Sequence, residues 1–249
     1  MPYIDLHCHL LYGVDDGAQD YRQMCRMADI AYENGTRVLC ATPHFNPEIF
    51  THRPEREERA FEELTAYCKE KHPDMTLLLG NEIFIFRDAL DLLRAGEARP
   101  LGNSNTVLVE FLPDEEFPLM KQALFRLSAA GYRPLLAHAE RYSALRTPKN
   151  IVELKQQNVR ISVNAASVVG KNGFFVKRYV CHLLKHGLVS LVASDGHTSD
   201  STGVIPSLSK CAAYINKHFN PAYTEQLLYT TPKRMLETTP ALQTETERV

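Results

Sequence analysis

The start of the chain holds several side chains that bind metal ions or exchange protons. His7 and His9 follow a short apolar run, and Asp15 and Asp16 come soon after them. Because side chains alternate faces along a β-strand, we expect the two histidines on one face and Cys8 on the other. Two imidazoles on one face of a strand end can hold one ion, but they can equally be ordinary surface residues. The rest of the sequence has to distinguish these two cases.

Side chains of the same kinds recur at one place in a repeated pattern. Seven short runs rich in Val, Ile and Leu alternate with segments of helical periodicity, at residues 3–6, 37–42, 76–80, 106–111, 133–138, 159–165 and 189–194. Six of these seven runs end in, or lead into, a histidine or a carboxylate, and the first such residues are His7, His44, Glu82, Glu110, His138 and Asp195. Active sites of α/β proteins are built at the carboxyl ends of parallel strands, so the pattern predicts one site there.

The longer segments have the features of helices, with expected ranges 20–34, 53–72, 86–95, 118–131, 148–157, 173–187, 206–218 and 221–237. Asp20 and three prolines stand at expected helix starts, and three glycines stand at expected helix ends. Alternation of strands and helices predicts parallel strands joined by right-handed crossovers. We therefore expect an α/β fold, a closed or nearly closed TIM-like barrel, with an open doubly wound sheet as the alternative. No break in composition marks a second domain, and residues 238–249 are expected to form a polar tail.

The composition is that of an ordinary globular protein and excludes several classes of function. The 249 residues are 44% hydrophobic and 23% charged, and a net charge of −2 disfavours nucleic-acid binding. No apolar run approaches the length of a membrane span, and the N-terminus does not resemble a signal peptide. The six cysteines are scattered without a CxxC pair, which indicates reduced thiols and a cytoplasmic location.

The number of candidate ligands predicts more than one ion. One ion takes about four to six ligands, so nine candidates indicate two or three ions with bridging carboxylates. Imidazoles with carboxylates favour manganese, iron or zinc over calcium. Three divalent ions would outweigh four carboxylates and suit an anionic substrate such as a phosphate ester. The candidates are His7, His9, Asp16, His44, Glu82, Glu110, His138, Asp195 and His197, and spacing alone does not choose between Asp15 and Asp16.

As an ordered set, the motifs HxH, DDG, TPH, HAER and SDxH resemble the PHP (polymerase and histidinol phosphatase) superfamily. More closely, IDLHCHLLYGVDDGA, ATPHFNP, LVEF, LLAHAERY and LVASDGH resemble the bacterial manganese-dependent protein-tyrosine phosphatases of capsule and exopolysaccharide loci. This resemblance implies a single domain over residues 1–237, a distorted (β/α)7 barrel, with Mn²⁺ ions at the strand C-termini. The implied substrate is a phosphotyrosine protein, the tail of a bacterial tyrosine kinase that controls polysaccharide export.

The resemblance also assigns roles to residues of this chain. The family's metal ligands fall on the nine candidates named above, which selects Asp16 over Asp15. The family's phosphate-contacting arginine falls on Arg141 in the HAER motif. We expect Arg141, His197 and Asp16 to act in catalysis. The hydrolytic mechanism, and not the resemblance, makes His197 a candidate proton donor, although a metal ligand does not readily serve both roles.

One departure from the family concerns substrate phosphate. An arginine commonly follows the SDxH motif, but here no basic residue stands between His197 and Lys210. Two alternatives follow: phosphate affinity is weaker than in the family, or Lys171 or Arg178 supplies the missing charge from another loop.

Other functions fit the same residues. The alternatives are a small-molecule phosphatase of the histidinol-phosphate type and a non-catalytic metal-binding scaffold. A cysteine-based phosphatase does not fit, because no cysteine is followed by five residues and an arginine.

Overall fold

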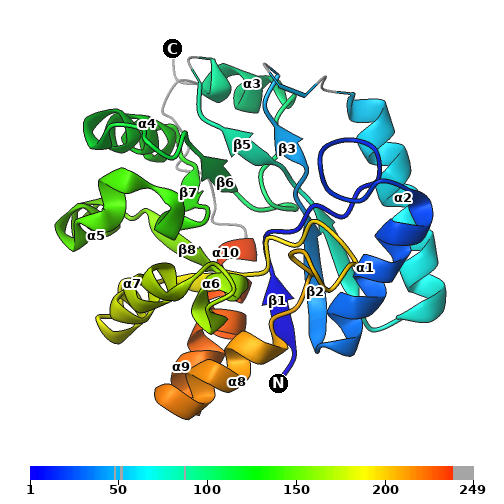
Figure 1. Cartoon of the computed structure of the whole chain (residues 1–249). Coiled ribbons are helices and arrows are strands. Elements are labelled where there is room, and N and C mark those ends of the chain that lie inside the picture. Colours follow the sequence, from blue (N-terminus) through cyan, green and yellow to red (C-terminus); the bar gives the residue numbers. More distant parts are fainter. Residues whose placement is uncertain (48, 51–52, 87, 238–249) are drawn as a thin grey trace.

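The structure is a computed structural model that describes residues 1–47, 49–50, 53–86 and 88–237, so the predicted tail at 238–249 lies outside the described residues. It is an α/β fold whose parallel strands lie inside a surrounding set of helices (Figure 1). The strands are β1 (Tyr3–Asp5), β2 (Thr36–Ala41), β3 (His44–Phe45), β4 (Thr76–Leu79), β5 (Glu82–Phe84), β6 (Thr106–Glu110), β7 (Arg133–Leu136), β8 (Arg160–Asn164) and β9 (Leu191–Ala193).

Helix boundaries follow local chemistry where the sequence predicts them. The Asp20 side chain accepts a hydrogen bond from the backbone N–H of Gln23 and so caps α1. Gly131 follows the end of α4 with a φ of 89°, a left-handed conformation that favours glycine. The helices are α1 (Tyr21–Glu33), α2 (Pro54–Lys71), α3 (Ala89–Ala95), α4 (Phe117–Ala129), η1 (Ala139–Arg141), η2 (Ser143–Arg146), α5 (Pro148–Gln156), α6 (Ala165–Val169), α7 (Phe174–Lys185), α8 (Ser209–His218), α9 (Pro221–Glu225), η3 (Gln226–Thr230) and α10 (Thr231–Leu236).

Several predicted boundaries were wrong. The predicted strands 37–42 and 76–80 each resume after a short break, as β3 and β5. The predicted strand 159–165 ends at Asn164, because the unpredicted helix α6 starts at the next residue. Helix α8 starts at Ser209, later than predicted, and the residues before it are in a loop, in which the N–H of Ser207 donates to the carbonyl of Ile205. The predicted helix 221–237 is divided among α9, η3 and α10, and Pro232 there lacks the N–H of a regular turn.

The parallel strands form one curled arrangement. Hydrogen bonding gives the orders β1-β2-β4 and β3-β5-β6-β7-β8-β9, and the chain runs from β2 into β3 and from β4 into β5. Beyond β1 and β9, the N–H of Asp195 donates to the carbonyl of His7 at 2.9 Å, and the N–H of His9 donates to the carbonyl of Gly196 at 2.8 Å. The segments that follow the first and last strands therefore lie side by side.

The core has an inner and an outer part, because side chains alternate across each strand. Leu108, Leu135 and Leu191 are fully buried in one cluster together with Met235 of α10. Their neighbours along the strands, such as Val109, face the outer helices in a larger cluster.

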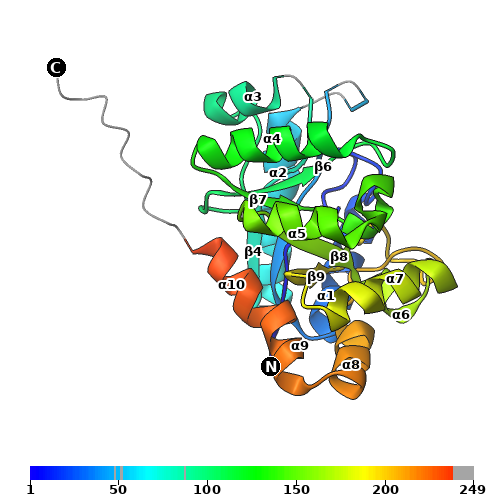
Figure 2. The ribbon, with the colours of Figure 1, turned by 90° about the vertical axis from the view of Figure 1, so that its left-hand side faces the viewer.

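Helix α10 lies at the amino ends of the strands, where the Thr106 hydroxyl donates to the carbonyl of Met235. Figure 2 shows α9 at the end of the molecule where the N-terminus lies. In the described part of the chain no helix has the length and apolar character needed to cross a membrane. All six thiols are free, as predicted.

Candidate metal centre

The structure brings all nine predicted ligands together at the carboxyl ends of the strands. Eight of them fall into three overlapping groups, in each of which one ligand atom per residue lies within 4.8 Å of the others. The ninth, His138, has its Nε2 atom 2.8 Å from Oε1 of Glu82. The groups are His7, His9, Glu82 and Asp195; His9, Asp16, His44 and His197; and His44, Glu82 and Glu110.

The first group is buried and compact. The Nε2 atoms of His7 and His9 are 3.1 Å apart, as expected for alternate residues on one strand face. Oε2 of Glu82 lies 3.1 and 3.3 Å from these two nitrogens, and Oδ1 of Asp195 lies 3.2 and 3.5 Å from them. Cys8 points the other way, into the core, where its thiol contacts the carbonyl of Gly196.

Two oxygens of this group fit a bound cation. Oε2 of Glu82 and Oδ1 of Asp195 are buried and make no hydrogen bond to any described residue. A buried carboxylate oxygen without a partner is costly, because it has lost its hydration. A metal ion coordinated by these oxygens and by the facing imidazoles would remove that cost.

The second and third groups lie nearer to solvent. Oδ1 of Asp16 is 3.5 Å from Nε2 of His44 and 3.5 Å from Nε2 of His197, and its side chain is 61% exposed. Nδ1 of His44 is 3.0 Å from Oε1 of Glu110 and 3.2 Å from Oε2 of Glu82. Glu82 therefore connects the buried group to the outer ligands.

The pKa values of three candidate ligands follow from the charges gathered around them. Burial and His9 lower the pKa of His44, but the carboxylates of Asp16, Glu110 and Glu82 outweigh both and raise it to about 10. Burial raises the pKa of Glu82, but the facing imidazoles of His7 and His138 hold it well below its usual range. Burial and the nearby His9 lower the pKa of His197 to about 4, so this imidazole is neutral and able to act as a ligand.

Asp15 has a role that the sequence analysis missed, since it orients a histidine. Its Oδ2 atom accepts hydrogen bonds from Nδ1 of His9 at 2.8 Å and from the backbone N–H of His44 at 3.0 Å. Its Oδ1 atom accepts from the N–H of Gly17 at 2.9 Å. A proton on Nδ1 of His9 leaves Nε2 free to bind a metal ion. Of the two adjacent aspartates, Asp16 is thus the candidate ligand and Asp15 supports His9.

Asn164 is a second residue that the sequence analysis missed. It is the last residue of β8, the strand for which the sequence predicted no candidate ligand. Its Nδ2 atom donates a hydrogen bond to Oδ2 of Asp195 at 2.7 Å. Its position at the carboxyl end of an apolar run was a usable signal. Tyr142 similarly places its hydroxyl 3.3 Å from Nδ1 of His138.

The backbone is strained at two of the candidate ligands. His138 has a φ of 31° and Asp195 a φ of 54°, in the left-handed region that residues with a Cβ rarely occupy. Such conformations cost about 1–3 kcal/mol each and concentrate at functional sites.

Arg141 lies at the edge of the cluster with its side chain 46% exposed. One terminal nitrogen donates to Oδ2 of Asp195 at 2.6 Å. A guanidinium has five N–H donors, so others remain for an anionic substrate. Lys171 follows α6 and lines a separate cavity, and Arg178 is exposed on α7. Their role toward phosphate stays a prediction.

Comparison with known families identifies the origin of this arrangement. The family described as "Capsular polysaccharide synthesis, CpsB/CapC" matches residues 3–237. The chain belongs to the CpsB/CapC family. The chain is 30% identical to the tyrosine-protein phosphatase YwqE of Bacillus subtilis over 195 residues, 78% of this chain and 77% of YwqE. It is 27% identical to the tyrosine-protein phosphatase CpsB of Streptococcus pneumoniae over 239 residues, 94% of this chain and 98% of CpsB.

A solved structure agrees with this membership. A crystal structure reported for YwqE from Bacillus subtilis and CpsB from Streptococcus pneumoniae, "unique metal-dependent tyrosine phosphatases", matches with a TM-score of 0.81. The match has 27% identity and covers 89% of each chain. These relatives are metal-dependent enzymes, and the imidazoles and carboxylates of this CpsB/CapC chain meet in groups that could hold metal ions.

Proposed function

We propose that the chain is a metal-dependent phosphatase that removes phosphate from tyrosine residues of proteins. The observation that carries the proposal is the convergence of the nine side chains in a chain of the CpsB/CapC family. We assign two or three ions to the nine ligands, with Mn²⁺ first and iron or zinc as alternatives. His7, His9, Glu82 and Asp195 would hold the buried ion position, and Asp16, His44, Glu110, His138 and His197 would complete the others.

The chain's own residues then have distinct tasks in hydrolysis. Bound divalent ions would supply a water of lowered pKa and positive charge for the phosphoryl oxygens. Arg141 donates N–H groups to the phosphoryl group and stabilises the charge that develops there. Asp16 is the more exposed of the two other residues assigned to catalysis, and its Oδ1 atom lies 3.5 Å from Nε2 of His197; because the pKa of His197 is lowered to about 4, this imidazole can accept a proton but holds none to donate at neutral pH.

An apolar hollow beside the ligands supports an aryl phosphate as the substrate. A cavity of about 250 Å³ is lined by the candidate site residues His44, Glu110 and Arg141 and by the apolar side chains of Phe50, Phe84 and Leu112. The ring of Phe50 lies parallel to that of His44, with centroids 5.3 Å apart and an angle of 4°. A tyrosine ring can enter the cavity and pack against its apolar lining while its phosphate reaches the ligands. Phenolate also leaves more readily than a serine alkoxide because its conjugate acid has a pKa of about 10.

The remaining proposals concern context. The protein substrate is proposed to be the phosphorylated tail of a bacterial tyrosine kinase in the control of capsule or exopolysaccharide synthesis, in the cytoplasm. We also propose that the two sheets form one distorted (β/α)7 barrel within a single domain over residues 1–237. The inner leucine cluster and the hydrogen bonds between the segments after β1 and β9 support this closure.

The test compares substrates and variants with manganese present. Wild-type protein should hydrolyse a phosphotyrosine peptide faster than phosphoserine peptide or histidinol phosphate. Arg141→Ala should lower kcat/KM at least about a hundredfold while the metal content stays near wild type, and Arg22→Ala, on the exposed side of α1, serves as the matched control. Faster turnover of histidinol phosphate would indicate a small-molecule phosphatase. Metal-loaded protein that hydrolyses no phosphoester would indicate a scaffold.

A further inference from the structure

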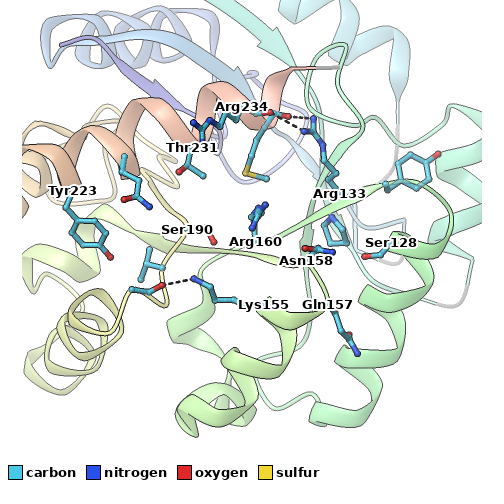
Figure 3. A pocket seen from close by; sticks show the side chains of 16 residues that line it. Ser128, Arg133, Lys155, Gln157, Asn158, Arg160, Ser190, Tyr223, Thr231 and Arg234 are labelled. Carbon is cyan, nitrogen blue, oxygen red and sulfur yellow. Dashed lines mark hydrogen bonds between the residues drawn. The ribbon is translucent and has the colours of Figure 1, made fainter. Parts of the chain in front are cut away.

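A second, larger cavity lies at the opposite end of the strands from the candidate metal centre. Its volume is about 590 Å³, and Figure 3 shows the side chains that line it. Arg133 and Arg160 are the first residues of β7 and β8, whereas His138 follows the other end of β7. Five residues of extended chain separate Arg133 from His138, a distance of about 16 Å. The two sites are therefore distinct.

The lining of this cavity is strongly basic although the whole chain is slightly acidic. Four cationic side chains contribute to it: Arg133, Lys155, Arg160 and Arg234. The described lining residues include no aspartate or glutamate. In Figure 3 the Arg160 side chain lies between those of Lys155 and Arg133. Like charges gathered without an acidic partner in the lining indicate a site for an anion.

Two of the cations are held in place and keep unused donors. Arg133 donates from its terminal nitrogens to the carbonyls of Arg234, Met235 and Glu237, at 3.1, 2.8 and 2.5 Å, which leaves one terminal N–H unused, and its Nε atom is buried without a described partner. Lys155 donates to the carbonyl of Gly187 at 2.7 Å, which occupies one of its three N–H groups. Side chains that are already fixed lose little conformational entropy when a ligand binds.

The electrostatics agree with the geometry. Burial and then the charge of Arg160 lower the pKa of Arg133, although the carboxylate of Glu237 acts in the opposite direction. Burial and then Arg160 also lower the pKa of Lys155. Arg160 therefore lies close enough to both groups to repel their charge, and a bound anion would relieve that repulsion.

We propose that this cavity binds a small organic anion that carries at least two negative charges and is about the size of a nucleotide. The clustered cations match a diphosphate or a similar dianion. The volume exceeds what inorganic phosphate needs, and Val189, Tyr223 and Met235 provide apolar surface for a ring or chain. Ser190 and Thr231 add hydroxyl groups to the lining.

The competing explanation of the basic lining is that it only stabilises the fold. Arg133 and Lys155 donate hydrogen bonds to carbonyls at helix ends, and such bonds stabilise those ends without any ligand. Arg160 separates the two explanations. It is exposed at the start of β8, so its charge can be removed with little effect on folding. Arg234, exposed on α10, provides a second variant of the same kind.

Calorimetric titration of the metal-loaded full chain tests the proposal, with α,β-methylene-ADP as the probe and adenosine as its uncharged counterpart. We expect α,β-methylene-ADP to bind and adenosine not to bind. Arg160→Gln and Arg234→Gln should each weaken binding about tenfold or more, because a charge-assisted hydrogen bond is lost. Arg22→Gln should leave it unchanged, and Arg141→Ala should leave unchanged the binding component that Arg160→Gln and Arg234→Gln weaken. Absence of binding at millimolar concentration, equal binding of adenosine, or binding that neither Arg160→Gln nor Arg234→Gln weakens would overturn the proposal.

Discussion

Replacing Asp15 by asparagine should weaken metal binding although it removes none of the nine candidate ligands. The buried carboxylate accepts from Nδ1 of His9 and from the backbone N–H groups of Gly17 and His44. Asparagine has one carbonyl oxygen, so its NH₂ group would face at least one of these donors. His9 would then lose the hydrogen bond that fixes its tautomer and ring orientation.

The magnitude follows from these interactions. Burial raises the pKa of Asp15, but His9 and the two N–H groups outweigh burial and lower it from 3.8 to about 2. A difference of about 2 units corresponds to about 2.5 kcal/mol of stabilisation of the folded chain. Because the folded-state pKa is the lower one, this stabilisation is present above pH 4 and is lost as the pH falls toward 2. Loss of a residue that orients a ligand typically costs 10–100-fold in metal affinity or activity, and we expect about that for Asp15→Asn.

Metal affinity is measured by titrating the metal-free protein with manganese, and activity by the turnover of p-nitrophenyl phosphate. Unfolding in urea measures the stability of the folded chain. Asp20→Asn is the matched control, because asparagine caps a helix as well as aspartate does. If Asp15→Asn binds manganese and turns over substrate within twofold of wild type, the assignment of Asp15 as the residue that orients His9 is wrong.

Further predictions concern the aryl pocket, the loop after β1 and the inner core. Phe50→Ala should raise KM for a phosphotyrosine peptide about fivefold or more and leave KM for a phosphoserine peptide nearly unchanged, whereas equal effects on both would refute an aryl pocket. Gly17→Ala would place a Cβ atom 2.1 Å from the carbonyl oxygen of His9, so manganese affinity should fall at least tenfold by titration, and unchanged affinity would contradict the loop geometry. Leu135→Ala should lower the free energy of unfolding by about 2–5 kcal/mol in urea, and a loss below about 1 kcal/mol would show that the inner cluster is not tightly packed.

The sequence predicted the convergence of the ligands because strand polarity determines it. Once His44, Glu82 and His138 each follow an apolar run in a chain of alternating strands and helices, parallel pairing places them at the same end. This prediction depends only on the order in which strands and helices alternate. Errors of a few residues at the ends of these elements therefore did not change the predicted position of the ligands. The predicted runs end at the breaks, which Pro43 and the pair Gly80 and Asn81 mark, but strands β3 and β5 beyond them were missed, because two or three residues are too few to show a period.

Other features depend on contacts between distant segments and could not be derived from spacing. Asp15 and Asp16 are neighbours of the same chemical type, and only the loop geometry turns one toward His9 and the other toward His44 and His197. The contact of Asn164 with Asp195 joins β8 to the segment after β9. The basic cavity at the other end of the strands depends on where α10 lies, which no local pattern determines.

The most direct test of the central claim is the metal content of purified protein, measured by mass spectrometry. Turnover of a phosphotyrosine peptide is measured on the same samples, and both measurements compare wild type with Glu82→Gln. Glu82 contacts His7, His9, His44 and His138, so it connects all parts of the cluster. We expect two or three ions per wild-type chain, and an activity that a chelator abolishes and manganese restores. The Glu82→Gln variant should lose at least one ion and its activity. Wild-type protein without bound metal, or with turnover that a chelator leaves unchanged, would contradict the central claim.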